Sequence, residues 1–208
     1  MSPPFVPAED DLRAIFIHVP KAAGTSVRRA LYGTKSFHIP AIRYLAADKD
    51  RFERYFKFCF VRNPWDRVCS AYHYLWIKRH ADQSFPDHRW ASHYLSEIKN
   101  FGEFVARLDD DQDFCVTVRR YIHFRDQADW VTAPGNRTRP LVDFIGRYER
   151  LDEDYRALET RLGLSVPLPS ERVRRDRRDF RELYDSRMVD VIARIYATDI
   201  ELFGYNFE

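Results

Sequence analysis

The 208-residue sequence has few cysteines, almost no net charge and no long apolar run. Its cysteines, Cys59, Cys69 and Cys115, show no Cys-x-x-Cys spacing, which argues against both a disulfide framework and a zinc site. The formal net charge is +2, so bulk charge does not indicate a partner such as duplex nucleic acid or an anionic membrane. An anion-binding site in this chain must therefore be local.

The sequence also lacks segments that direct a protein into a membrane. Its first residues contain no basic stretch followed by an apolar core, and no later run reaches transmembrane length. We therefore expect a cytoplasmic protein without a membrane anchor. The length suits one domain with a substantial core, so a single domain over residues 1–208 is the expectation.

Residues 14–31 contain a pattern of strand, tight loop and helix. Residues 14–19 are apolar, β-branched or aromatic and are followed by proline, which predicts a buried strand, and residues 27–31 have a helical composition. Small loop residues let backbone N–H groups approach a ligand, and the start of the helix adds partial positive charge. The loop consists of Lys21, Ala22, Ala23, Gly24, Thr25 and Ser26. With the lysine charge and two hydroxyls, it is predicted to bind a phosphate-like anion.

The position of the lysine narrows the kind of anion site. The P-loop of ATPases and GTPases has the order G-x-x-x-x-G-K-[ST], with lysine after the last glycine. Here Lys21 precedes Gly24, which argues against an ordinary ATPase or GTPase. A tight strand-to-helix connection with a solvated lysine is the plain alternative, so a second anion-binding element is needed.

A second junction of strand and helix begins at residue 56. Residues 56–61 are apolar almost throughout, as expected of a parallel strand covered on both faces. Asn63 suits an N-cap and Pro64 suits the first helical position, so a helix is predicted to run to about residue 78. The apolar face of this helix is expected to pack on the sheet.

Arg62 and Ser70 lie at this second junction, at the edge where open α/β sheets bind ligands. A surface ion pair with Asp66 is the alternative role for Arg62, and a tolerated small residue is the alternative for Ser70. Strands alternate with helices along the chain, which predicts an α/β protein with a central, mainly parallel sheet.

Several further elements are expected from the pattern. Residues 1–12 are interpreted as an acidic lead-in. The predicted strands and helices are a short strand at 36–39, helices at 41–54, 101–108 and 114–121, and a long amphipathic helix at 185–203.

The two junctions together resemble the cofactor motifs of sulfotransferases, especially the carbohydrate sulfotransferases of the heparan sulfate 2-O and chondroitin type and their bacterial relatives. In that family the first motif binds the 5'-phosphosulfate of 3'-phosphoadenosine 5'-phosphosulfate (PAPS). The second motif uses an arginine and a serine eight residues later for the 3'-phosphate, and Arg62 and Ser70 have this separation. The resemblance continues in residues 141–151, which look like the family's late strand and following turn and lead into a helix over 152–162, and in residues 196–205, which resemble the family's C-terminal segment. It implies a P-loop-like three-layer sandwich.

The resemblance implies PAPS as cosubstrate and PAP as product, with no metal. Lys21 is assigned to the leaving phosphate oxygen, where negative charge grows during transfer. His38 is the candidate base, because an imidazole titrates near neutral pH and 2-O-type relatives have a histidine in a similar Phe-His context. Pro40 replaces their second histidine, and a partly buried histidine bonded to backbone is the alternative role for His38. His18 is interpreted as structural.

An arginine-rich run occupies residues 171–181. It is either a solvated loop or a flap that reaches the cofactor phosphates or an anionic acceptor, and in the second case Arg174 or Arg175 makes the contact. Residues 127–130 resemble a family segment near the acceptor cleft.

The expected acceptor carries a hydroxyl, and a glycan, glycolipid or small alcohol would all fit, with family analogy favouring sugar hydroxyls. A nucleotide or metabolite kinase and a non-catalytic nucleotide-binding protein remain alternative functions.

Overall fold

The computed structural model describes residues 4–33, 37–169 and 179–208. The chain forms two compact units, each assembled from separate stretches of sequence. The first unit comprises Met1–Arg62, Asp126–Arg175 and Glu201–Gly204, and the second comprises Asn63–Arg125, Asp176–Ile200 and Tyr205–Glu208. The single-domain expectation stays a prediction.

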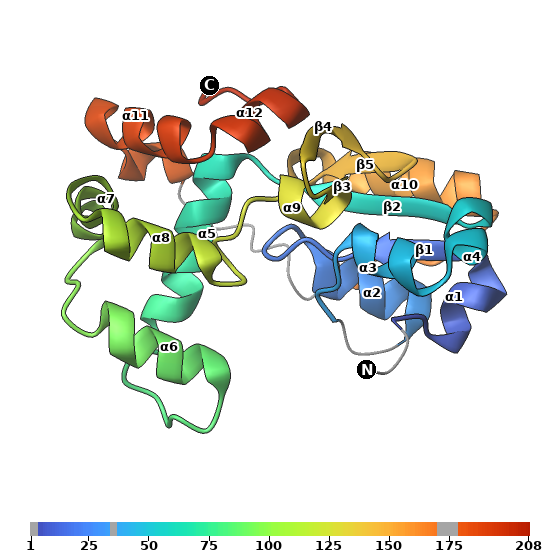
Figure 1. The fold of residues 1–208 in the computed structure, drawn as a ribbon, viewed down its shortest axis with the longest axis horizontal. Coiled ribbons are helices and arrows are strands. Elements are labelled where there is room, and N and C mark those ends of the chain that lie inside the picture. Colours follow the sequence, from blue (N-terminus) through green and yellow to red (C-terminus); the bar gives the residue numbers. More distant parts are fainter. Residues whose placement is uncertain (1–3, 34–36, 170–178) are drawn as a thin grey trace. The chain divides into compact units, whose positions relative to one another are not determined.

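The first unit contains a parallel three-stranded sheet with the strand order β1-β2-β5 (Figure 1). The strands are β1 (Ala14–Ile17), β2 (Phe56–Val61) and β5 (Phe144–Arg147). Phe58 in the central strand lies opposite Phe16 on one side and Phe144 on the other. All residues of β1 and all but the first of β2 are buried, so both faces of these strands are covered. This arrangement confirms the expected α/β class with a parallel sheet flanked by helices.

Two helices pack against one face of the sheet. They are α2 (Gly24–Tyr32) and α10 (Leu151–Leu162), and their side chains join the phenylalanines of β1 and β2 in one apolar cluster. Val27 and Leu31 come from α2, and Tyr155 and Leu158 from α10. Helix α2 ends at Gly33, whose φ of 61° is in the left-handed region that glycine adopts without strain. The helix that follows the predicted anion loop is thus anchored on the sheet.

The N-terminal segment is a helix, not the lead-in that the sequence suggested. Helix α1 spans Pro7–Leu12, and Glu9 in its first turn is fully buried. Glu9 accepts hydrogen bonds from Arg28 of α2 (3.0 Å) and from the hydroxyl of Tyr44 (3.4 Å). Glu9 therefore joins α1 to α2 and to Tyr44.

The stretch between Gly33 and β2 departs from the prediction in two ways. Residues 37–40 form neither strand nor helix, and residue 36 lies outside the described residues. The single helix expected over 41–54 is two, α3 (Ala41–Ala47) and α4 (Lys49–Arg54). Asp48 separates them because its backbone is extended (φ −157°) and its carboxylate accepts the N–H of Arg51, which caps the second helix.

Three short elements complete the middle of the first unit. They are α9 (Ala128–Val131), which the strand β3 (Thr132–Ala133) follows at once, and the strand β4 (Asn136–Pro140). Strands β3 and β4 pair in an antiparallel hairpin, and a 3₁₀ turn over Tyr148–Arg150 links β5 to α10.

The second unit is a group of helices around an apolar core. Its helices are α5 (Pro64–Trp76), α6 (Pro86–Leu95), α7 (Phe101–Asp110), α8 (Gln112–Arg120) and α11 (Ser186–Ile195), with a 3₁₀ turn at Phe180–Leu183. Asn63 caps α5 as predicted, since its side chain accepts the N–H of Trp65. The apolar face of α5, including Trp65, Val68 and Tyr72, lies in this helical core and not on the sheet, which corrects the prediction.

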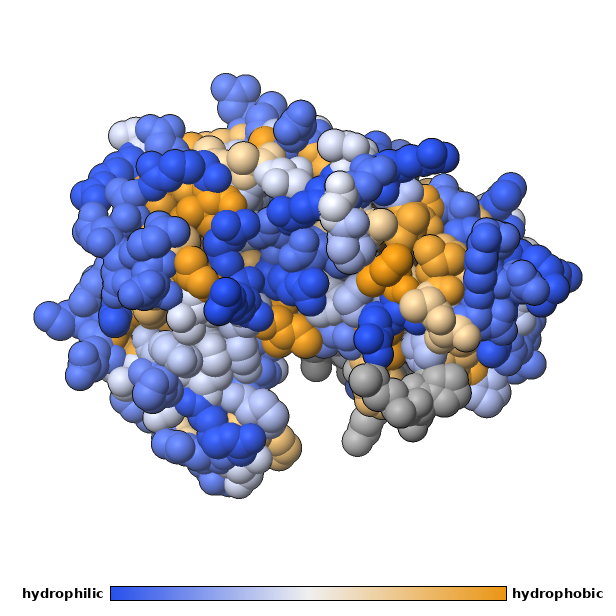
Figure 2. Space-filling model, in the orientation of Figure 1, coloured by the Kyte–Doolittle hydropathy of each residue, from blue (hydrophilic) through white to orange (hydrophobic). Residues whose placement is uncertain are grey.

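The predicted C-terminal helix over 185–203 is also two helices. Asp185 caps α11, and α12 spans Ala197–Phe203 after a break at Tyr196, whose φ and ψ are −109° and 26°. Among the helices of the described residues, none has the length and apolar character needed to cross a membrane. The face drawn in Figure 2 is mostly hydrophilic, with hydrophobic residues at several separate places.

Candidate functional site

The predicted anion loop has an unusual backbone between β1 and α2. Lys21 and Ala23 have φ values of 68° and 62°, in the left-handed region that non-glycine residues rarely adopt. Ala23 is the N-cap of α2 and has no side-chain oxygen to offer the helix. Within the described residues, the N–H groups of Gly24 and Thr25 therefore have no acceptor, and only those of Ser26 and Val27 bond the Ala23 carbonyl. A strained loop with open amides suits an anion.

Gly24 is required at the start of α2 because the imidazole of His18 lies against it. A Cβ at position 24 would overlap the His18 ring. His18 follows β1 and is 5% exposed, so it forms the buried support of the loop. The sequence interpretation of His18 as structural agrees with this packing, although the loop contact itself was missed.

The other loop residues differ in exposure. Ala22 and Gly24 are buried, Lys21, Ala23 and Ser26 are half-buried, and Thr25 is exposed. The loop thus contributes backbone amides, two hydroxyl side chains and one lysine to the junction of β1 and α2.

Arg62 directly follows β2 and contacts the anion loop. Arg62 is 3% exposed, so its side chain is buried and not on the surface, as the alternative of a surface ion pair would require. Its Nη1 donates to the carbonyl of Lys21 at 3.2 Å, and its guanidinium carbon lies 4.0 Å from the centroid of the Tyr148 ring. Because β1 and β2 are parallel neighbours, their carboxyl ends bring Lys21 and Arg62 to one edge of the sheet.

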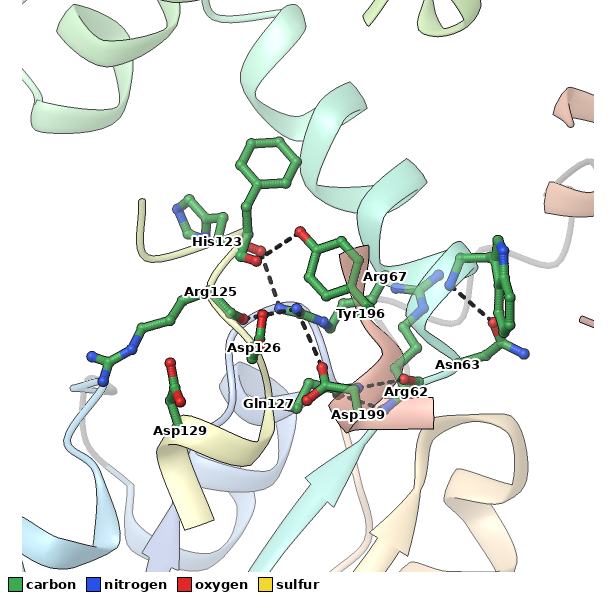
Figure 3. A network of polar contacts seen from close by, with 12 residues as sticks. Arg62, Asn63, Arg67, His123, Arg125, Asp126, Gln127, Asp129, Tyr196 and Asp199 are labelled. Atoms are coloured by element: carbon green, nitrogen blue, oxygen red, sulfur yellow. Dashed lines mark hydrogen bonds and ion pairs between the residues drawn. The ribbon is translucent and has the colours of Figure 1, made fainter. Parts of the chain in front are cut away.

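The backbone of Arg62 is held by the side chain of Gln127. The Arg62 N–H donates to Oε1 of Gln127 at 2.9 Å, and Nε2 of Gln127 donates to the Arg62 carbonyl at 2.8 Å. Figure 3 shows this pair of contacts. Sequence reasoning did not assign Gln127 or Tyr148 to the cofactor site, because both are distant from Arg62 along the chain.

His38 lies beside His18. Its Nδ1 is 3.1 Å from the His18 carbonyl oxygen, and the two imidazole centroids are 4.0 Å apart. A carbonyl only accepts, so this contact places the proton of the neutral ring on Nδ1 and the lone pair on Nε2. The ring of Trp130 lies 5.9 Å from that of His38. His38 thus makes the bond to backbone that the sequence analysis gave as its alternative role, and the same bond favours a tautomer in which Nε2 can accept a proton.

The remaining predicted site residues are Ser70, Arg174 and Arg175. Ser70 belongs to α5 in the second unit and is 7% exposed. Arg174 and Arg175 lie outside the described residues. Within the described part of the chain, no group of three or more His, Cys, Asp and Glu side chains is arranged to hold a metal ion.

The three cysteines, all among the described residues, are buried and form no disulfide with one another. Burial raises the pKa of the Cys59 thiol in the central strand, so this group stays protonated and does not act as a nucleophile.

The sheet, the strained loop and the adjoining arginine define an α/β protein with an anion-binding strand-to-helix junction. Comparison with known proteins identifies the class. The profile of the Sulfotransferase family matches residues 4–206, so the chain belongs to that family. It is accordingly an enzyme of the PAPS-dependent transferases.

One relative from the curated proteins is an uncharacterized protein of Archaeoglobus fulgidus. It is 32% identical over 120 residues, which cover 58% of this chain and 78% of the relative. No solved structure matches the chain.

Proposed function

We propose that this enzyme transfers a sulfuryl group from PAPS to a hydroxyl of a carbohydrate or glycoconjugate and releases PAP. The observation that carries the proposal is the contact between the two motifs, in which the Arg62 guanidinium bonds the carbonyl of Lys21. One nucleotide with phosphates at both ends of its ribose can then meet both motifs. The sugar acceptor is supported by the resemblance of these motifs to carbohydrate sulfotransferases, and a cytoplasmic location stays a prediction.

The anion loop fits the 5'-phosphosulfate. The open N–H groups of Gly24 and Thr25 and the positive end of α2 attract a phosphate oxygen, and Ala22, Ala23 and Ser26 shape the loop around it. Lys21 supplies a full positive charge beside these amides. In the proposed reaction Lys21 stabilises the phosphate oxygen that gains negative charge as its bond to sulfur breaks.

Arg62 is proposed to bind the 3'-phosphate together with Ser70, eight residues later in the chain. A guanidinium forms charge-assisted hydrogen bonds with phosphate, and a serine hydroxyl adds a donor. Arg174 and Arg175 remain proposed contacts to cofactor or acceptor.

His38 is proposed to accept the proton of the attacking hydroxyl at Nε2. Its Nδ1–H is fixed by the His18 carbonyl, so the ring keeps one orientation while Nε2 changes protonation. The acceptor oxygen forms the new bond to sulfur, and the phosphate oxygen of the nucleotide leaves with the electron pair of the broken bond.

The test is a transfer assay with labelled PAPS and a panel of glycan and small-molecule acceptors. Lys21→Ala should remain folded and lose nearly all turnover, while His38→Ala should flatten the acidic limb of the pH–rate profile. Normal turnover of the Lys21 variant would refute its role, and an unchanged profile would eliminate His38 as the base. A thermal-shift comparison of PAP with ATP and magnesium separates this function from a kinase, because only a kinase should prefer the triphosphate.

A further inference from the structure

Gln127 is a fully buried glutamine whose side-chain amide matches the backbone of Arg62. Its Oε1 accepts the Arg62 N–H at 2.9 Å and its Nε2 donates to the Arg62 carbonyl at 2.8 Å. Both bonds are near ideal length, and together they fix the position and the rotation of one residue's backbone. Figure 3 shows Gln127 in this position beside Arg62.

These bonds begin where the sheet stops. The last paired residue of β2 is Val61, which lies opposite Arg147 of β5. Arg62 is the next residue, so the amide of Gln127 replaces the neighbouring strand that would otherwise hold its backbone. A buried backbone N–H or carbonyl without a hydrogen-bond partner costs free energy of folding, so the Arg62 backbone needs these two bonds from Gln127.

The guanidinium of Arg62 is held separately. It lies on the ring of Tyr148 and donates to the carbonyl of Lys21, as described above. Gln127 fixes the backbone of Arg62 and the loop fixes its guanidinium, so the Arg62 side chain is held in one conformation between these two points. Loss of the two Gln127 bonds releases the backbone end of Arg62, so its guanidinium is no longer held in a single position.

We propose that Gln127 is a positioning residue that sets the enzyme's selectivity for a nucleotide with a 3'-phosphate. It acts through Arg62 and does not contact the nucleotide. The inference rests on the proposed function, because it requires that Arg62 binds the 3'-phosphate.

Two variants separate the contributions of the amide. Gln127→Met has nearly the same length and removes both bonds to Arg62. Gln127→Glu keeps the acceptor but places an ionised oxygen against the Arg62 carbonyl, and protonation of this carboxyl restores a donor. Thr132→Val is the matched control, because it removes one buried bond in the adjoining segment, from the Thr132 hydroxyl to the Ala128 carbonyl (2.8 Å), without touching Arg62.

The experiment measures the affinities of PAP and AMP by calorimetry for wild type and the three variants. We expect Gln127→Met to lose tenfold or more in PAP affinity with AMP affinity changed less than twofold, and Thr132→Val to keep the wild-type ratio. Combining Gln127→Met with Arg62→Ala should cause no further loss of PAP affinity. For Gln127→Glu, the PAP-to-AMP ratio relative to wild type should rise as the pH is lowered from 8 to 5.5.

The outcomes distinguish the inference from the function on which it rests. If wild type binds PAP no better than AMP, the proposed role of Arg62 is wrong and the inference is overturned with it. If wild type discriminates but the Gln127 variants keep the ratio, or lose both affinities equally, the inference alone is overturned. Should Gln127→Met fail to fold, the pH series of Gln127→Glu tests the same point in one protein, and a ratio that does not change with pH overturns it.

Discussion

Removal of the Arg28 charge should make the stability of the enzyme depend on pH in a defined way. Arg28 is 3% exposed, and its Nη1 bonds Oε1 of Glu9, which is 0% exposed. Burial raises the pKa of Glu9, and hydrogen bonds from the Val6 N–H and from Arg28 only partly oppose this. Arg28→Met therefore leaves a buried carboxylate without its cation.

The expected loss follows from the protonation of Glu9. Arg28 lowers the pKa of Glu9 in wild type, so its loss leaves burial to raise this pKa further, and the folded variant holds a proton at pH values where the unfolded chain has released it. The loss of stability relative to wild type therefore grows with pH, and its upper range is the roughly 3–5 kcal/mol known for breaking a buried ion pair. Stability should thus fall as the pH rises.

The assay is urea denaturation of Arg28→Met at pH 5.5, 6.25 and 7, relative to wild type. Arg29→Met removes the same charge from an exposed neighbour and should cost less than about 0.5 kcal/mol. The double variant Glu9→Gln and Arg28→Met should lose the pH dependence. A loss for Arg28→Met that is constant across this range would refute the reasoning.

Two predictions concern the second unit. Burial alone would raise the pKa of Asp87, but hydrogen bonds from His123, Tyr121 and Tyr74 hold this pKa well below its usual range. The ionised Asp87 therefore stabilises the fold above about pH 4, and this stabilisation is lost as the pH falls. Asp87→Asn should cost about 1–3 kcal/mol at pH 7 and less at pH 3 in thermal denaturation, and an equal cost at both would contradict this. The buried hydroxyl of Tyr72 has no hydrogen-bond partner among the described residues. Tyr72→Phe should therefore leave the stability unchanged or raise it by up to about 2 kcal/mol. A clear decrease in melting temperature would contradict this prediction.

Local signals predicted the elements that local chemistry controls. Strand β2 has the predicted bounds, and Asn63 and Pro64 mark the start of α5 because capping depends on neighbouring residues only. The stop at Gly33 follows from the same kind of signal. The expected parallel sheet follows from the order of these elements.

Contacts between distant residues were beyond the reach of the sequence. The helix α1 was missed because Glu9 is buried by partners 19 and 35 positions later, Arg28 and Tyr44. The apolar face of α5 was recognised, but periodicity shows only that a face is apolar and not which surface covers it. Gln127 was missed as a support of Arg62 for the same reason, since 65 positions separate them.

The most direct test of the proposed nucleotide site is a titration of PAP and AMP into wild type and Arg62→Ala. An arginine–phosphate contact contributes about 1.5–3 kcal/mol, so wild type should prefer PAP by about 10- to 150-fold. Arg62→Ala should lose this preference while its affinity for AMP stays close to that of wild type. The account is contradicted if the affinities for both nucleotides fall by the same factor in Arg62→Ala, or if wild type does not discriminate between them. In either case Arg62 does not bind the 3'-phosphate, and the two motifs do not bind a single nucleotide between them.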